Sequence, residues 1–162
     1  MQHRKIAFIG AGNMTRSIIS GLVKNAYPAD LITASNPSME KLTALQSDFK
    51  INITQENNEA LDTADVIVLA VKPQLMEQVC GELALKHSLS DKLFVSIAAG
   101  ITTSRLQNML GGSFPIIRTM PNTPSSLGKG MTGLFADVNI DKIDKQYAAD
   151  LMSQVGEIAW VE

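Results

Sequence analysis

The residues with the clearest chemical purpose stand near the N-terminus, where Gly10, Ala11 and Gly12 directly follow a short apolar run. A helical pattern of apolar residues that includes Ile18 and Leu22 begins immediately afterwards. A strand, a glycine turn and a helix in this order offer backbone N–H groups and a helix N-terminus to a pyrophosphate. Gly10 permits a tight turn, and Gly12 lets a phosphate approach the backbone without an intervening Cβ. We therefore predict a dinucleotide site, although a turn without any ligand has the same pattern.

The third position of this glycine fingerprint, where a small residue is usual, is occupied by Thr15. A second candidate region, Asn36 and Ser38, follows the next strand-like run. An NAD site usually has an acidic residue about 20 residues beyond the glycines, which accepts a hydrogen bond from the ribose 2′-OH. Neither residue is acidic, and Lys41 or Arg16 could add positive charge for a 2′-phosphate. The sequence thus favours NADP over NAD, while simple helix capping by Asn36 and Ser38 remains the alternative.

The third long strand-like run ends in small residues, Ala70 and Val71, against which a flat adenine or ribose could lie. Lys72 follows, and Pro73 restricts it to extended geometry. Ligands of doubly wound sheets gather at the C-terminal ends of the strands. Lys72 is therefore either a ligand-facing residue or an ordinary exposed lysine.

Two later strand ends also suit a ligand. Residues 96–100, which include Ala99, are mostly small and permit close backbone approach. Asn122 and Thr123 lie between two prolines, in a rigid loop suited to positioning a substrate or to forming a structural turn. They are the substrate-side candidates, and the sequence identifies no catalytic residue.

The elements that must position these residues alternate along the chain. Strand-like runs occur at 6–9, 31–35, 66–71, 93–97, 116–118 and 158–161, with a further run at 131–135, and helical patterns occur at 14–25, 38–48, 74–86, 102–110 and 142–154. Asn36 is the expected N-cap of the second helix, with Pro37 at its first position, and Thr102 or Thr103 caps a later one. The alternation predicts a Rossmann-type α/β fold, with a doubly wound, mostly parallel sheet and helices on both faces.

Composition excludes several function classes. A chain of 162 residues with a net charge of −2 and no Lys/Arg cluster does not suit binding to nucleic acid or an anionic membrane. No apolar run is long enough for a membrane span. We predict that the single cysteine, Cys80, is a small buried residue. One cysteine cannot form an intrachain disulfide, which is consistent with a reducing cytoplasm. His3 and His87 lack partners at metal-ligand spacing, so we expect no metal.

Four motifs, taken together and in order, resemble the pyrroline-5-carboxylate reductase family. They are residues 8–14, 70–73, 96–100 and 120–124. The resemblance covers the whole chain and implies hydride transfer from NADPH, or less readily NADH, to the imine carbon of 1-pyrroline-5-carboxylate, which gives L-proline. By motif match it implies a pyrophosphate site formed by Ile9, Gly10, Ala11, Gly12, Asn13 and Met14. It also implies a 2′-phosphate site at Asn36 and Ser38, an adenosine contact at Asn57, and a groove toward the nicotinamide lined by Ala70, Val71, Lys72 and Ala99.

The resemblance further implies a second, all-helical domain that builds a homo-oligomer and supplies much of the substrate pocket. Residues 1–162 contain no counterpart of it, so we expect them to be the NAD(P)-binding domain of such a reductase, inactive alone. Two other interpretations remain open. One is a related Rossmann oxidoreductase, either a 3-hydroxyacid dehydrogenase or a deazaflavin:NADP reductase, and the other is a non-enzymatic NADP-binding module. The loop at 120–124 argues against the first, although hydroxyacid dehydrogenases have similar loops.

Overall fold

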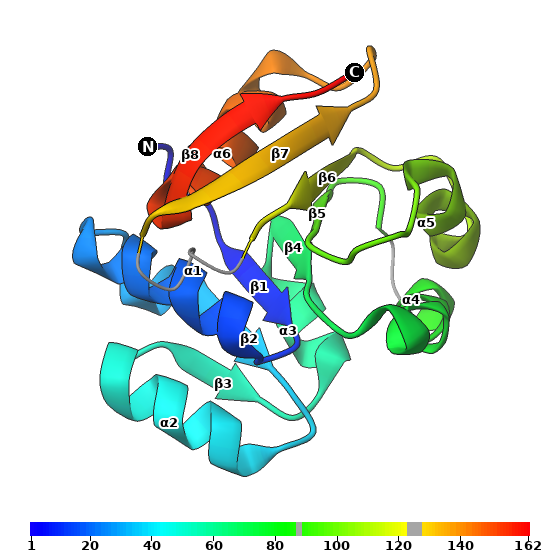
Figure 1. Cartoon of the computed structure of the whole chain (residues 1–162). Coiled ribbons are helices and arrows are strands. Elements are labelled where there is room, and N and C mark those ends of the chain that lie inside the picture. The colour runs from blue at the N-terminus through cyan, green and yellow to red at the C-terminus, as the bar shows by residue number, and fades with distance from the viewer. Residues whose placement is uncertain (87–88, 123–127) are drawn as a thin grey trace.

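The computed structural model describes residues 1–86, 89–122 and 128–162 (Figure 1). Its strands are β1 (Ile6–Ile9), β2 (Ile32–Ser35), β3 (Asn52–Thr54), β4 (Val66–Leu69), β5 (Leu93–Ser96), β6 (Ile116–Met120), β7 (Gly130–Ala136) and β8 (Gly156–Trp160). Within the described ranges they form one eight-stranded sheet in the order β3-β2-β1-β4-β5-β6-β7-β8. The predicted doubly wound sheet is confirmed.

Strands β1, β4 and β5 lie at the centre of the sheet, and every residue in them is buried. Their continuously apolar sequences are typical of parallel strands that are covered on both faces. Pairing is parallel from β3 through to β6. Strand β7 then pairs antiparallel with β6, and β8 pairs parallel with β7. The last two strands therefore run opposite to the rest.

Among the described elements, three helices cover each face of the sheet. Helices α1 (Asn13–Lys24), α2 (Met39–Phe49) and α6 (Lys142–Met152) pack on one face, and α3 (Asn57–Thr63), α4 (Pro73–Lys86) and α5 (Thr103–Leu110) pack on the other. Phe8 packs on the first face in one hydrophobic cluster with Ile18 and Leu151, and Phe94 packs on the second with Leu83 and Leu106. Two short 3₁₀ turns, η1 (Ala29–Leu31) and η3 (Ser153–Val155), precede β2 and β8.

Sequence and structure differ in a few elements. Strand β3 and helix α3 occupy a stretch in which no element was expected. The expected N-cap at Asn36 is wrong: α2 begins at Met39, and Ser38 caps it by accepting a hydrogen bond from the Lys41 backbone N–H. Pro37 therefore precedes the cap and lies outside the helix. The predicted cap at Thr102 is confirmed, because its hydroxyl accepts a hydrogen bond from the Arg105 backbone N–H at 3.2 Å.

Two close contacts join segments that are distant in the sequence. A Cβ placed on Gly21 of α1 would lie 2.7 Å from both the Cβ and the carbonyl oxygen of Gln154, so α1 rests directly on η3. The Tyr27 and Tyr147 hydroxyls lie 2.7 Å apart, and the Tyr27 hydroxyl also donates to the Arg4 carbonyl oxygen. Burial raises the pKa of both phenols above the usual value near 10.

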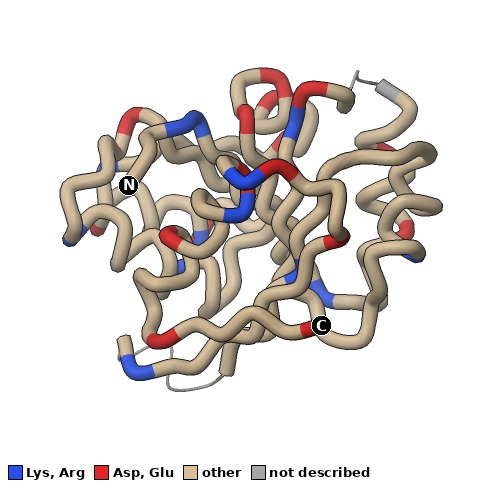
Figure 2. The backbone as a smooth tube through the Cα atoms, turned by 90° about the horizontal axis from the view of Figure 1, so that it is seen from above, with Lys and Arg blue, Asp and Glu red and all other residues tan. Residues whose placement is uncertain are grey.

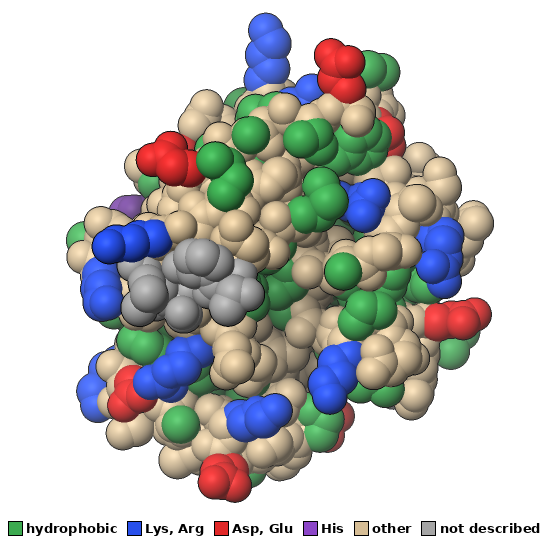
Figure 3. All heavy atoms as spheres, in the orientation of Figure 1, with side chains coloured by type: hydrophobic (Ala, Val, Ile, Leu, Met, Phe, Trp, Pro, Cys, Tyr) green, Lys and Arg blue, Asp and Glu red, His purple; other side chains and the backbone are tan. Residues whose placement is uncertain are grey.

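Charged residues of both signs are spread over the described part of the chain. Lys and Arg are interspersed with Asp and Glu along the described backbone (Figure 2). On the face shown in Figure 3, several Lys and Arg side chains stand around a central hollow, while the acidic side chains lie toward the outline. Among the described helices, none has both the length and the apolar character that crossing a membrane requires. Cys80 is buried in α4, as predicted, and burial raises its pKa to about 11.

Candidate functional site

The C-terminal ends of five parallel strands meet at one edge of the sheet. Ile9 at the end of β1 lies opposite Ser35 of β2 and Leu69 of β4. Leu69 lies opposite Ser96 of β5, which in turn lies opposite Arg118 of β6. The segments that leave these strands are therefore neighbours, and they contain most of the predicted site residues.

Backbone hydrogen bonds join the first turns at this edge. The Gly10 N–H donates to the Ser35 carbonyl at 2.8 Å, and the Ala70 N–H donates to the Ile9 carbonyl at 2.9 Å. The Ile97 N–H donates to the Leu69 carbonyl at 3.2 Å. These bonds continue the sheet pairing by one residue and hold the turns in fixed relative positions.

Gly10 occupies a position that only glycine fits. Its φ is +113°, in the region that L side chains rarely adopt. A Cβ there would lie 2.6 Å from the Ala70 carbonyl oxygen, which is backbone and cannot rotate away. The tight turn predicted from sequence thus has two physical causes, the backbone conformation and the approach of β4.

Gly12 lies in open space. Apart from Gly12 itself and its two chain neighbours, no heavy atom of the described residues lies within 4 Å of the position that its Cβ would take. Gly12 is the N-cap of α1 and offers no side chain to the N–H groups of the first turn, which also lacks acidic residues. By contrast, α2, α5 and α6 are capped by the side chains of Ser38, Thr102 and Asp141. The N-terminus of α1 is therefore open to an anion.

The other residues of the predicted pyrophosphate site differ in exposure. Ile9 is fully buried, so only its backbone can take part. Ala11 is nearly buried, Asn13 is exposed, and Met14 packs against the core. Within the described part of the chain, no acceptor is found for the backbone N–H of Ala11. The backbone of this turn thus has an available donor and open space for a phosphate group.

The region after β2 holds Asn36 and Ser38, and both are half-buried. The Asn36 N–H donates to the Thr54 carbonyl at 3.3 Å, which ties this turn to β3. Of the two candidate cations, Lys41 is exposed, whereas Arg16 forms an ion pair with Asp48. The Arg16 guanidinium also lies 5.0 Å from the centre of the Phe49 ring, so α2 already holds it.

Asn57, the predicted adenosine contact, is the first residue of α3. The Ser35 hydroxyl donates to its side-chain oxygen Oδ1 at 2.6 Å, and Ser35 is fully buried. This bond leaves the Asn57 amide nitrogen as the available donor. Sequence analysis missed Ser35 because a serine at the end of a strand carries no signal of its partner.

The residues predicted to line the groove toward the nicotinamide lie along the same edge. Ala70 and Val71 are half-buried, and Lys72 is exposed immediately before α4. Ala99 is also exposed and precedes Gly100, whose φ is +75°. The small residues after β5 are held in place by a bond from the Ala98 N–H to the Ser96 hydroxyl at 3.2 Å.

Of the two substrate-side candidates, Asn122 is exposed, and Thr123 lies outside the described residues. The Met131 N–H donates to the Asn122 side-chain oxygen Oδ1 at 2.9 Å, which ties Asn122 to β7. Arg118, which sequence analysis did not single out, precedes this loop on β6. Its Nε atom is buried, and no partner for it exists among the described residues.

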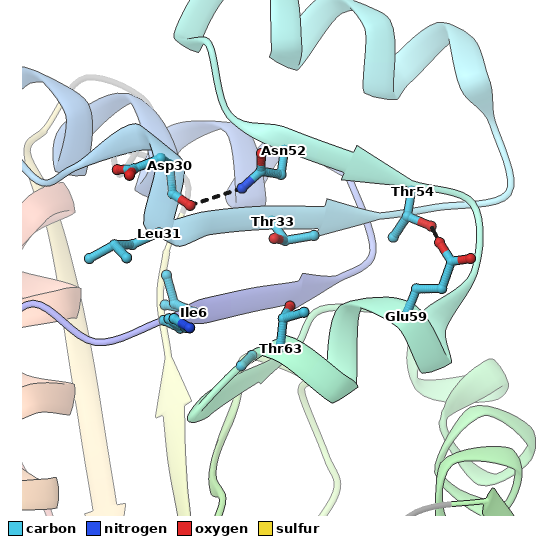
Figure 4. A pocket seen from close by; sticks show the side chains of 10 residues that line it. Ile6, Asp30, Leu31, Thr33, Asn52, Thr54, Glu59 and Thr63 are labelled. Atoms are coloured by element: carbon cyan, nitrogen blue, oxygen red, sulfur yellow. Dashed lines mark hydrogen bonds between the residues drawn. The ribbon is translucent and has the colours of Figure 1, made fainter.

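A separate hollow of about 390 Å³ lies on the face of the sheet beside β2 and β3 (Figure 4). Two hydrogen bonds join residues that line it. The Asn52 amide donates to the Asp30 carbonyl at 2.9 Å, and the Thr54 hydroxyl donates to Glu59 at 2.7 Å. The hollow includes no residue of the glycine turn.

Within the described ranges, no group of three His, Cys, Asp or Glu residues is placed to hold an ion. His3 is exposed, and His87 lies outside the described residues.

Comparison with known proteins gives consistent results. Residues 5–100 match the family described as "NADP oxidoreductase coenzyme F420-dependent". The chain is 53% identical over its full length to a protein of Vibrio alginolyticus named pyrroline-5-carboxylate reductase, and it spans 59% of that protein's length.

Two solved structures are also similar. One, of a pyrroline-5-carboxylate reductase from Coxiella burnetii, has a TM-score of 0.95 and 42% identity, with 99% of this chain and 60% of that chain covered. The other, of Plasmodium falciparum pyrroline carboxylate reductase with NADP bound, has a TM-score of 0.86 and 28% identity, with 100% of this chain and 59% of that chain covered.

Proposed function

This chain belongs to the family of NADP oxidoreductases described as coenzyme F420-dependent, and from that premise we propose that it is the NADP-binding part of a pyrroline-5-carboxylate reductase. The whole enzyme would reduce 1-pyrroline-5-carboxylate to L-proline. When bound, NADPH supplies the hydride that the imine carbon accepts. The similarity to the Vibrio alginolyticus protein over the full chain supports this choice of substrate.

One observation carries the proposal. The two glycines of the turn differ in their surroundings. Gly10 packs against the backbone of Ala70, whereas the space beside Gly12, where a phosphate would lie, is open among the described residues. The uncapped N-terminus of α1 adds first-turn N–H groups and the positive end of the helix dipole. This arrangement fits a pyrophosphate that lies across residues 10–14.

The remaining cofactor contacts follow the strand ends outward from that turn. We assign the 2′-phosphate to Asn36 and Ser38, because the segment between β2 and α2, residues 36–38, contains no acidic side chain to repel it. Asn57, oriented by Ser35, contacts the adenosine. Ala70, Val71, Lys72 and Ala99 line the path toward the nicotinamide, and Asn122 and Thr123 lie on the substrate side. NADH binds at the same place but more weakly.

The proposal divides the enzyme into two parts. Residues 1–162 bind the cofactor, and a helical domain beyond them completes the substrate pocket and forms the homo-oligomer. The coverage of about 59% of the related proteins' length supports this division. A single, buried cysteine is compatible with the proposed cytoplasmic location.

Calorimetric titration of this chain with NADPH and NADH tests the cofactor assignment. We expect saturable binding of NADPH and weaker binding of NADH, and no binding of either would overturn the proposal. The substrate assignment is tested by following NADPH absorbance with the full-length protein and 1-pyrroline-5-carboxylate.

A second candidate is reduction of a deazaflavin, because the family description itself names coenzyme F420. Against it stands the 53% identity with a pyrroline-5-carboxylate reductase, which extends through residues 101–162, beyond the part matched by the family. A turnover panel that offers both substrates to the full-length protein distinguishes the two functions.

A further inference from the structure

Thr15 lies at the position of the glycine fingerprint where a third small residue is usual. Its buried hydroxyl is nevertheless hydrogen-bonded. Thr15 is the third residue of α1, and only 1% of its surface is exposed. Its hydroxyl donates to the Gly10 carbonyl oxygen at 2.9 Å. A helical threonine commonly bonds a carbonyl three or four residues earlier in its own helix. Here the bond spans five residues and reaches back across the turn.

This hydrogen bond is one of three contacts that hold Gly10 in place. The Gly10 N–H is held by the Ser35 carbonyl of β2 at 2.8 Å. Its Cα lies against Ala70, so closely that a Cβ would lie 2.6 Å from the Ala70 carbonyl oxygen. Thr15 holds the remaining polar group, the carbonyl. Gly10 is itself buried, so this carbonyl cannot turn to water instead.

The orientation of the Gly10 carbonyl determines the orientation of the next N–H group. The two belong to one planar trans peptide unit, in which C=O and N–H point in opposite directions. The Thr15 hydroxyl therefore fixes the direction of the Ala11 N–H through the peptide plane. Within the described residues that N–H has no acceptor, which is the state expected of a donor reserved for a ligand.

We propose that Thr15 is a positioning residue for the pyrophosphate: its hydroxyl fixes the peptide between Gly10 and Ala11, and through it the donors of the phosphate-binding turn. This inference rests on the proposed NADP site and adds to it a residue that touches no ligand. A threonine replaces the usual small residue because its hydroxyl gives the turn a second anchor, from the helix side.

The test compares two ligands that differ in the group that Thr15 is proposed to serve. NADPH contains the pyrophosphate, whereas adenosine 2′-monophosphate keeps the adenosine and the 2′-phosphate but lacks it. Thr15→Val keeps the shape of the side chain and removes the hydroxyl. We expect it to weaken NADPH binding about fivefold, the value of one ordinary hydrogen bond, and to leave the affinity for adenosine 2′-monophosphate unchanged. Thr15→Ser should restore NADPH binding.

Thr132→Val is the matched control, because Thr132 of β7 is fully buried and its hydroxyl has no partner in the described part of the chain. This variant should bind both ligands as the wild type does. If valine at position 15 prevents folding, Thr15→Ala carries the same expectation, and circular dichroism shows which variants are folded.

The outcomes distinguish a failure of the role proposed for Thr15 from a failure of the proposed function. Equal weakening of both ligands by Thr15→Val would mean a general structural role and would overturn the proposal for Thr15, as would unchanged affinity for both. Failure of the wild type to bind either ligand would instead overturn the proposed function.

Discussion

Gly10 and Ala70 are in direct backbone contact: a Cβ on Gly10 would lie 2.6 Å from the Ala70 carbonyl oxygen. The contact joins the turn after β1 to the end of β4, two segments that each contain predicted cofactor residues. It fixes the glycine turn against the sheet, so we expect the stability of the fold and the proposed cofactor binding to depend on the same residue.

Gly10→Ala should therefore damage both properties. The methyl group would meet immobile backbone, and φ would remain in an unfavourable region, so we expect a loss of more than about 2 kcal/mol in the free energy of unfolding. Urea denaturation measures it. Gly111→Ala is the control, because Gly111 also has a positive φ but open space around it. That variant should lose only about 1 kcal/mol. Equal losses for the two variants would contradict the importance of the Ala70 contact.

Gly12→Val should leave the fold intact and abolish detectable NADPH binding. Gly12 has φ −84° and an open Cβ direction, so valine fits the protein but fills the space proposed for the pyrophosphate. Thermal unfolding and calorimetric titration of the same sample measure the two properties. Gly81→Val, at an equally open position in α4, should keep wild-type affinity. A folded Gly12→Val protein that still binds NADPH would place the phosphate elsewhere.

Asn36→Asp should shift the cofactor preference toward NADH. A carboxylate after β2 accepts a hydrogen bond from a ribose 2′-OH and repels a 2′-phosphate. We expect NADPH affinity to fall about tenfold, which corresponds to roughly 1.4 kcal/mol. Asn139→Asp, which adds the same charge at an exposed position in another loop, serves as the control. An unchanged ratio of the two dissociation constants would show that Asn36 does not face the 2′ position.

The paired phenols Tyr27 and Tyr147 should make the fold sensitive to alkali. Burial raises the pKa of both groups, so the folded protein keeps protons that the unfolded chain loses above about pH 10. The unfolded state then binds fewer protons, and stability falls as the pH rises. Urea midpoints between pH 8 and 11 measure this slope. Tyr147→Phe should flatten it, whereas a slope identical to the wild type would mean that Tyr147 ionises without unfolding.

Residues 1–162 alone should bind NADPH but reduce 1-pyrroline-5-carboxylate far more slowly than the full-length protein. Hydride transfer requires the imine carbon to be held about 3–3.5 Å from the nicotinamide. Asn122 is the described candidate on the substrate side, and its side-chain oxygen is already bonded to the Met131 N–H. Parallel assays of NADPH oxidation give the ratio of rates. Comparable turnover would place the complete active site within these residues.

The sequence predicted those elements whose conformation is determined by consecutive residues. The order of strand, glycine turn and helix at 6–24 is visible in consecutive residues, and the alternation of apolar runs suffices for a doubly wound sheet. The short elements β3 and α3 escaped because 52–63 is mostly polar and too short for a period to emerge. Residues 131–135 were correctly predicted to form a strand. Its antiparallel direction depends on its pairing with β6, and the local sequence pattern does not predict that pairing.

Within the candidate site, backbone geometry was easier to predict than side-chain partners. The roles of Gly10 and Gly12 follow from the absence of a Cβ. The hydrogen bonds from Thr15 to Gly10 and from Ser35 to Asn57 join residues that are 5 and 22 positions apart in the sequence. The residue types alone do not predict either bond. Ser38 displaced Asn36 as the helix cap because both can cap and only the path of the turn decides between them.

The contact between Gly21 and Gln154 fixes the distance between α1 and η3. Gly21 lies about 12 Å, by helix geometry, from the N-terminal end of α1, which faces the proposed phosphate site. A methyl group at position 21 would lie 2.7 Å from Gln154, so α1 and η3 would have to move apart to accommodate it. The position of the backbone donors that we propose for the phosphate therefore depends on a segment just before β8, at the other end of the chain.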